Sequence, residues 1–215
     1  RPEFINWGRF FQGGHLCDVH WLWHRSYEEV PLDLERYLSG TTKLWVATTS
    51  VVTGEARYFS VDDQNIHDVL TASCSIPLAY RDYPIVENEP MSDGGIADSI
   101  PVAEAYRRGA RDITVVLSRP LGYQKKPLAF PALTKRMFRE QPGLAEALIR
   151  RGERYNETLE FIRNPPDDCR LRIIAPPEDF PVSRLTTDLN KLDLGYQQGH
   201  RAAMAYLADM AREVA

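Results

Sequence analysis

Cysteine is scarce in this sequence, and its spacing argues against two classes of small stabilised domain. The chain holds only Cys17, Cys74 and Cys169, and no two of them form a Cys-x-x-Cys pair. An odd number at these separations argues against a disulfide framework and against a structural zinc site. We therefore expect reduced thiols and a cytoplasmic protein.

Long apolar runs and an excess of positive charge are missing as well. No run approaches the roughly 20 apolar residues that cross a bilayer. The formal net charge of −4 and the isoelectric point near 5.8 give no overall attraction to nucleic acid or to an anionic membrane. We predict no nucleic-acid partner. The 215 residues, 43% of them hydrophobic and without internal repeats, are expected to bury a core and form a single domain over 1–215.

The stretch richest in candidate chemistry is 91–101, which reads Met-Ser-Asp-Gly-Gly-Ile-Ala-Asp-Ser-Ile-Pro. Gly94 and Gly95 follow Asp93, lack a Cβ and can adopt positive φ. The chain can therefore turn beside the carboxylate, and another group can approach it closely. An ordinary Asp-Gly turn between two strands is the alternative interpretation.

Helix and strand signals on both sides of this stretch predict an α/β fold. Asp98 or Ser99 can cap a short helix with Pro101 in its first turn, and the β-branched run 112–117 follows. That run suits a strand covered on both faces, as in a parallel sheet between helices. We predict a mixed sheet with a parallel centre and helices on both faces. Strands are also expected at 43–50, 56–61, 85–86 and 171–175, and helices at 4–11, 31–38, 62–73, 130–138, 143–163 and 188–214.

Three motifs in fixed order carry a family resemblance. They are Ala72-Ser73-x-Ser75-Ile76-Pro77, then Asp93-Gly94-Gly95-Ile96, then Pro101-Val102-x-x-Ala105-x-x-x-Gly109-Ala110. Together they resemble the patatin-like phospholipases, especially the bacterial predicted patatin-like esterases, from about Asn6 to the C-terminal helix. The resemblance implies a cofactor-free hydrolase of carboxylic esters, either lipid acyl esters or small esters. It implies that Asp93 is the base of a Ser–Asp dyad, with Gly94 and Gly95 supporting its loop and Asp98 bracing it.

The sequence departs from this family at the nucleophile. The family places its serine in a Gly-x-Ser-x-Gly elbow and its oxyanion hole in a Gly-rich loop, both N-terminal to the region matched here. No serine of this chain has glycine at both the second position before and the second position after it. We therefore expect the C-terminal portion of a hydrolase, inactive alone, with its serine upstream of Arg1. Cys74 and Ser75 are alternative nucleophiles close to the acid in sequence.

A second candidate site follows the predicted strand 112–117. Arg119, Tyr123, Lys125 and Lys126 lie in a loop at the carboxyl end of that strand, where open α/β sheets gather ligands. These cationic and aromatic groups suit a lipid headgroup phosphate and peripheral membrane contact. A solvated loop is the alternative for these residues. For the whole chain, the alternative is a non-catalytic module that binds lipid or a partner.

Histidines and strand edges give two further expectations. His20 and His24 are one helical turn apart, and His15 precedes them, as in some metal sites. No acid completes a recognisable ligand set, so we predict no metal.

If the strand that carries the nucleophile is missing, its neighbours present unpaired edges, and we expect a homodimer of the fragment.

Overall fold

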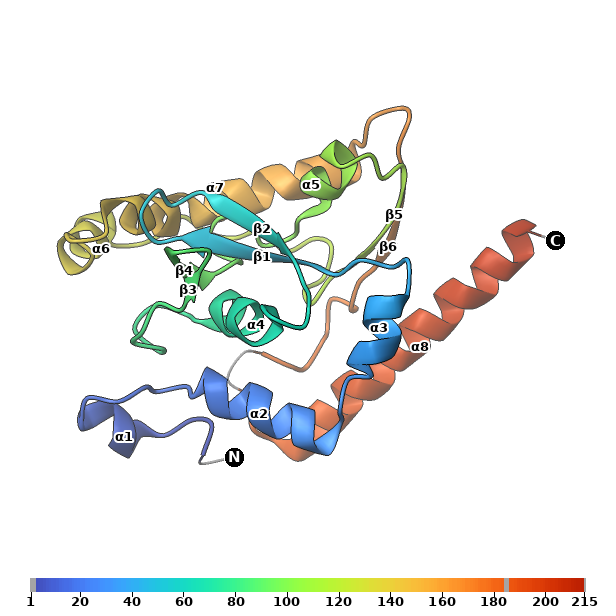
Figure 1. Ribbon diagram of the computed structural model, residues 1–215. Helices are drawn as coiled ribbons and strands as arrows, with labels where there is room; N and C mark the ends of the chain where they lie inside the picture. Colours follow the sequence, from blue (N-terminus) through green and yellow to red (C-terminus); the bar gives the residue numbers. More distant parts are fainter. Residues whose placement is uncertain (1–2, 184–185, 215) are drawn as a thin grey trace. The chain divides into compact units, whose positions relative to one another are not determined.

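The computed structural model describes residues 3–183 and 186–214 and divides the chain into two compact units (Figure 1). The first unit holds Arg1–Pro101 and Lys126–Tyr155, and the second holds Val102–Lys125 and Asn156–Ala215. Each unit contains one of the two sheets. The expectation of one domain over the whole chain stays a prediction.

The sheet of the first unit is antiparallel throughout. Gly54 turns its first hairpin with a φ of 73°, a left-handed value that favours glycine. Glu87 and Asn88 turn its second hairpin with φ values of 49° and 64°, as a two-residue hairpin turn requires. The strands are β1 (Trp45–Ser50), β2 (Ala56–Ser60), β3 (Ile85–Val86) and β4 (Glu89–Asp93), in the spatial order β2-β1-β4-β3.

The first three helices begin where short polar side chains cap them. Asn6, Asp18 and Asp33 each accept a hydrogen bond from the backbone N–H three residues further on, which satisfies a free donor of the first turn. The helices of the first unit are α1 (Trp7–Phe11), α2 (Val19–Glu29), α3 (Leu34–Ser39), α4 (Ile66–Cys74), α6 (Pro131–Met137) and the first part of α7 (Pro142–Arg163).

Helices cover both faces of the first sheet, as predicted. Val69 of α4 is fully buried and belongs to the same core cluster as Met91 of β4. Leu144 of α7 belongs to a second cluster together with Val51. Figure 1 shows α4 on one side of β1 and the start of α7 on the other. Burial of each large side chain contributes about 2 kcal/mol, so the first cluster holds β1 and β4 against α4, and the second holds the residue after β1 against α7.

The second unit contains a parallel pair of strands, β5 (Asp112–Val116) and β6 (Arg170–Ile174). Helix α5 (Val102–Arg107) packs against β5. Helix α8 (Leu189–Val214) starts at Asp188, whose carboxylate accepts a hydrogen bond from the backbone N–H of Asn190 at 2.9 Å. The second half of α7 also belongs to this unit.

The α/β class is confirmed, but two details of the predicted sheet are wrong. The first sheet has no parallel centre; parallel pairing occurs between β5 and β6, which a long segment containing helices connects. Strand β5 is not covered on both faces within the described residues, since Ile113 and Val115 are buried while Val116 is 72% exposed. Valine and threonine also favour half-exposed strands, so the β-branched run did not distinguish the two cases.

Candidate functional site

Asp93 is the last residue of β4, at the point where the chain leaves the first sheet. It pairs with Thr48 of β1, and its backbone N–H donates to the carbonyl of Ser75 at 3.1 Å. Ser92 also donates its hydroxyl to the Ser75 carbonyl, at 2.9 Å. The end of β4 is thus fixed both to its neighbouring strand and to the residue that follows α4. We call residues 93–98 the acid loop.

Close approach, rather than positive φ, distinguishes the two glycines of the acid loop: it requires glycine at Gly94 and leaves Gly95 tightly surrounded. A Cβ on Gly94 would lie 2.1 Å from the carbonyl oxygen of Ala47, a distance that no side chain can adopt. A Cβ on Gly95 would lie 3.0 Å from Oδ1 of Asp93. Neither glycine has a φ in the left-handed region, so the expected turn at positive φ is wrong, and the expected close approach is confirmed.

The carboxylate of Asp93 is held by the loop itself. Its Oδ1 accepts a hydrogen bond of 2.7 Å from the backbone N–H of Gly95. Its backbone carbonyl accepts from the N–H of Ile96 at 3.1 Å. The side chain is half-buried. A carboxylate fixed in this way keeps one orientation, which an acceptor of a proton needs.

The side chain of Thr49 on β1 links two backbone groups of the acid loop. Its hydroxyl donates to the backbone carbonyl of Asp93 at 2.8 Å and accepts from the backbone N–H of Ala97 at 3.1 Å. The residue is fully buried. One hydroxyl therefore provides a hydrogen-bond partner both for the carbonyl of Asp93 and for the N–H of Ala97.

The neighbouring Ser99 and side chains from two more distant segments hold the middle and the end of the loop. The carbonyl of Gly95 accepts from Ser99 Oγ and from Arg151 Nε, both at 2.7 Å. Asp98 accepts from the hydroxyl of Tyr58 on β2 at 2.6 Å and from the backbone N–H of Ile100 at 3.2 Å. Asp98 therefore braces the loop through hydrogen bonds, although its function stays a prediction.

The two alternative nucleophiles have surroundings unsuited to attack. Burial raises the pKa of the Cys74 thiol, and the negative charge of Asp93 raises it further, so the reactive thiolate is disfavoured at neutral pH. Ser75 is buried, and its hydroxyl donates to the carbonyl of Thr71 at 2.6 Å. Neither group has the exposed, activated geometry of a catalytic nucleophile.

The predicted lipid-binding residues are divided between the two units. Arg119, Tyr123 and Lys125 belong to the second unit, and Lys126 belongs to the first. Within the second unit the Arg119 guanidinium lies 5.2 Å from the centre of the Tyr123 ring, a cation–π distance. The backbone N–H of Lys125 donates to Asn156 Oδ1 at 3.0 Å. Their function in binding stays a prediction.

The two histidines of α2 line a small hollow. His20 and His24 lie with His67 of α4 around a hollow of about 180 Å³, and Glu28 completes its polar wall. In the two ranges that the structure describes, no group of three or more histidine, cysteine, aspartate or glutamate side chains is arranged to hold a metal ion.

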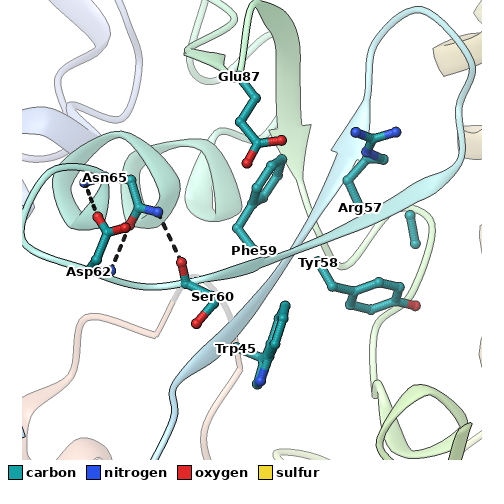
Figure 2. A pocket seen from close by; sticks show the side chains of 9 residues that line it. Trp45, Arg57, Tyr58, Phe59, Ser60, Asp62, Asn65 and Glu87 are labelled. Carbon is teal, nitrogen blue, oxygen red and sulfur yellow. Dashed lines mark hydrogen bonds between the residues drawn. The ribbon is translucent and has the colours of Figure 1, made fainter. Parts of the chain in front are cut away.

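A larger hollow of about 490 Å³ lies along β2, the outer strand of the first sheet. Figure 2 shows Tyr58 and Phe59 on opposite sides of this strand, as the alternation of a β-strand requires. Asn65 closes one side, donating to the carbonyl of Ser60 at 2.9 Å. Because Tyr58 also binds Asp98, this hollow is connected to the acid loop through one side chain.

Sequence reasoning missed the residues that hold the loop from outside. Thr49 had a weak signal, because Thr48, Thr49 and Ser50 are three hydroxyl residues at the end of an apolar strand, and all three are fully buried. Tyr58 and Arg151 gave none, since nothing in a sequence says which strand or helix faces a loop far away along the chain.

Two family models match parts of this chain. Residues 5–106 match the model of the family described as Patatin-like phospholipase, and this range includes the whole acid loop. This part of the chain is thus similar to the patatin-like phospholipases. Residues 141–214 match a second family, described as a domain of unknown function (DUF6363).

A curated relative aligns with nearly the whole chain. It is "Uncharacterized protein YjjU" from Escherichia coli (strain K12), which is 28% identical over 216 residues. The alignment covers 99% of this chain and 60% of the relative. The chain therefore spans about three fifths of the length of this relative. In the described part of the chain, no helix combines the length and the apolar composition that crossing a membrane requires.

Proposed function

We propose that Asp93 is the general base of a Ser–Asp dyad that hydrolyses carboxylic esters of lipids. The support is the coincidence of two findings: the family match covers the acid loop, and the loop fixes the Asp93 carboxylate through Gly95 and the Asp93 backbone through Thr49. The nucleophile is a serine outside these 215 residues, since none of the serines in the chain lies in a Gly-x-Ser-x-Gly elbow.

In the proposed chemistry, Asp93 accepts one proton and gives it up again in each half-reaction. The serine hydroxyl attacks the ester carbonyl while Asp93 accepts its proton, and the proton then passes to the alcohol that leaves. Water attacks the resulting acyl-enzyme, again giving its proton to Asp93, and the serine takes that proton back as the fatty acid leaves. No histidine, metal or cofactor takes part in these steps.

A serine-directed probe tests where the nucleophile lies. We expect a fluorophosphonate to label a form of the protein extended upstream of Arg1 and to leave the 215-residue chain unlabelled. In the extended form, Asp93→Asn should slow labelling, because the serine loses its base.

The other outcomes of this experiment contradict the proposal in different ways. Labelling of the 215-residue chain would place the nucleophile among its own serines. Absence of labelling in both forms would favour the non-catalytic module that binds lipid or a partner. Asp68→Asn is the matched control, since Asp68 is an exposed aspartate of α4 in the same unit.

A further inference from the structure

An exposed cluster of aromatic rings lies near the start of the first unit. Trp7 is 59% exposed and Phe11 is 80% exposed. With Phe10 they form a triangle of ring contacts, with centroids 5.8 to 6.3 Å apart. Large rings gathered in contact with water are unusual on a soluble surface and mark an interaction site. Figure 1 shows α1, which carries all three, at the edge of the first unit.

These rings are presented by a closed loop, residues 4–17, which we call the aromatic loop. The N–H of Asn6 donates to the carbonyl of Leu16 at 3.0 Å, and Ile5 forms a β-bridge with Cys17. Arg9 lies inside the loop and donates three hydrogen bonds of 2.8 to 3.0 Å to backbone carbonyls. The loop is therefore ordered before it meets any partner, and binding costs little conformational entropy.

Arg81 fastens the aromatic loop to the segment that follows α4. It donates to the carbonyls of Gly14 and Phe10 at 2.9 and 3.1 Å, and its guanidinium lies 4.9 Å from the centre of the Phe10 ring. The Tyr80 ring stacks on His15 with centroids 4.1 Å apart. This segment continues directly from Ser75, whose carbonyl holds the backbone of Asp93.

The charges around the rings favour a partner without net negative charge. Arg9 pairs with Asp18 at 3.4 Å, and His15 faces Asp82 at 3.6 Å. With Arg81 and the exposed Glu3 included and histidine neutral, the acids of this rim outnumber the bases by one. An anionic surface is thus not attracted. A zwitterionic lipid headgroup is complementary, because its cation can lie over the rings and its phosphate can approach the exposed guanidinium of Arg81.

We propose that the aromatic loop is an interfacial anchor that places Trp7, Phe10 and Phe11 in the headgroup region of a zwitterionic lipid surface. Aromatic side chains favour this region because their rings are largely apolar and the indole also has a polar N–H. The anchor rests on the proposed function, since it would hold the segment bonded to Asp93 next to an ester at the interface.

Sedimentation with phosphatidylcholine vesicles tests the anchor on the 215-residue chain without requiring turnover. We expect the chain to sediment with the vesicles and the double variant Trp7→Ser/Phe11→Ser to bind at least tenfold more weakly. Both side chains are exposed, so circular dichroism should report an unchanged fold. Phe130→Ser is the matched control, since Phe130 is 72% exposed in the same unit but lies outside the aromatic loop. It should bind like the parent chain.

Three results would overturn the proposal. They are absence of binding by the parent chain, equal loss of binding in the control, and concentration-dependent self-association that the double variant abolishes, which would make the rings a contact between two copies. Asp93→Asn should leave vesicle binding unchanged. The anchor and the Ser–Asp dyad can therefore fail independently.

Discussion

Each residue of the Asp-Gly-Gly sequence makes a different physical contribution to the acid loop. Asp93 supplies the carboxylate, Gly94 lets the carbonyl of Ala47 pass at close range, and Gly95 donates its N–H to the carboxylate. An Asp-Gly hairpin signal would have the same first two letters, but here the loop does not form a hairpin turn. The surroundings of these glycines are the Ala47 backbone at Gly94 and the Asp93 carboxylate at Gly95. The sequence alone does not show that the Ala47 backbone lies against Gly94.

The two glycines should therefore respond differently to alanine. Gly94→Ala brings a Cβ onto backbone of β1, which cannot yield, so we expect a loss of about 3 kcal/mol or more in the free energy of unfolding. Gly95→Ala meets a carboxylate oxygen at 3.0 Å, which a small side-chain movement can relieve, so about 1 kcal/mol is expected. Urea denaturation of both variants measures the difference. Equal losses would contradict the close approach at Gly94.

Strand β1 supports the acid loop as well as the core. Val46 packs in the core cluster beside α4, whereas Thr49 directs a hydroxyl to both sides of the loop. These two hydrogen bonds satisfy the Thr49 hydroxyl where its burial is complete. The loop is thus positioned by an element about forty residues away in sequence.

Removal of the Thr49 hydroxyl should loosen the loop. Thr49→Val keeps the shape but leaves the buried N–H of Ala97 unpaired and removes one of the two hydrogen bonds that the Asp93 carbonyl accepts, so we expect a loss of about 2 kcal/mol in unfolding free energy. Hydrogen exchange at the Ala97 amide should become faster. Thr49→Ser keeps the hydroxyl and should restore slow exchange.

Thr48→Val is the control for this prediction. Thr48 is equally buried, but among the residues that the structure describes its hydroxyl makes only long contacts of 3.4 Å, with the Arg57 carbonyl and with Met91 Sδ. We expect a smaller loss of stability and no change in exchange at Ala97. Equal effects at the two positions would mean that the Thr49 hydroxyl is not the group that holds the loop.

The sequence predicted local elements better than their pairing. The strands expected at 43–50 and 56–61 and the helix expected at 188–214 follow from local residue patterns, and all are confirmed by β1, β2 and α8. The parallel centre and the two-sided burial of β5 were wrong, because the neighbours of a strand depend on contacts across the whole fold. For the same reason, the sequence did not identify Tyr58 and Arg151 as residues that contact the acid loop.

At the scale of the whole molecule, two separate segments of the chain match two different families. Residues 5–106 carry the patatin-like match and residues 141–214 match a domain of unknown function. The relative from Escherichia coli aligns with both. The proposed dyad needs a serine that these 215 residues do not offer in a Gly-x-Ser-x-Gly elbow, so it is tested in a form extended upstream of Arg1.

Ester turnover by the Asp93→Asn variant of that extended form is the most direct test of the dyad. The amide can still accept the hydrogen bond from Gly95 and should keep the fold, but it cannot take up the proton of a serine. We predict a loss of about 100-fold or more in kcat, with Asp68→Asn unchanged. Turnover by Asp93→Asn at the parent rate would show that Asp93 is not the base.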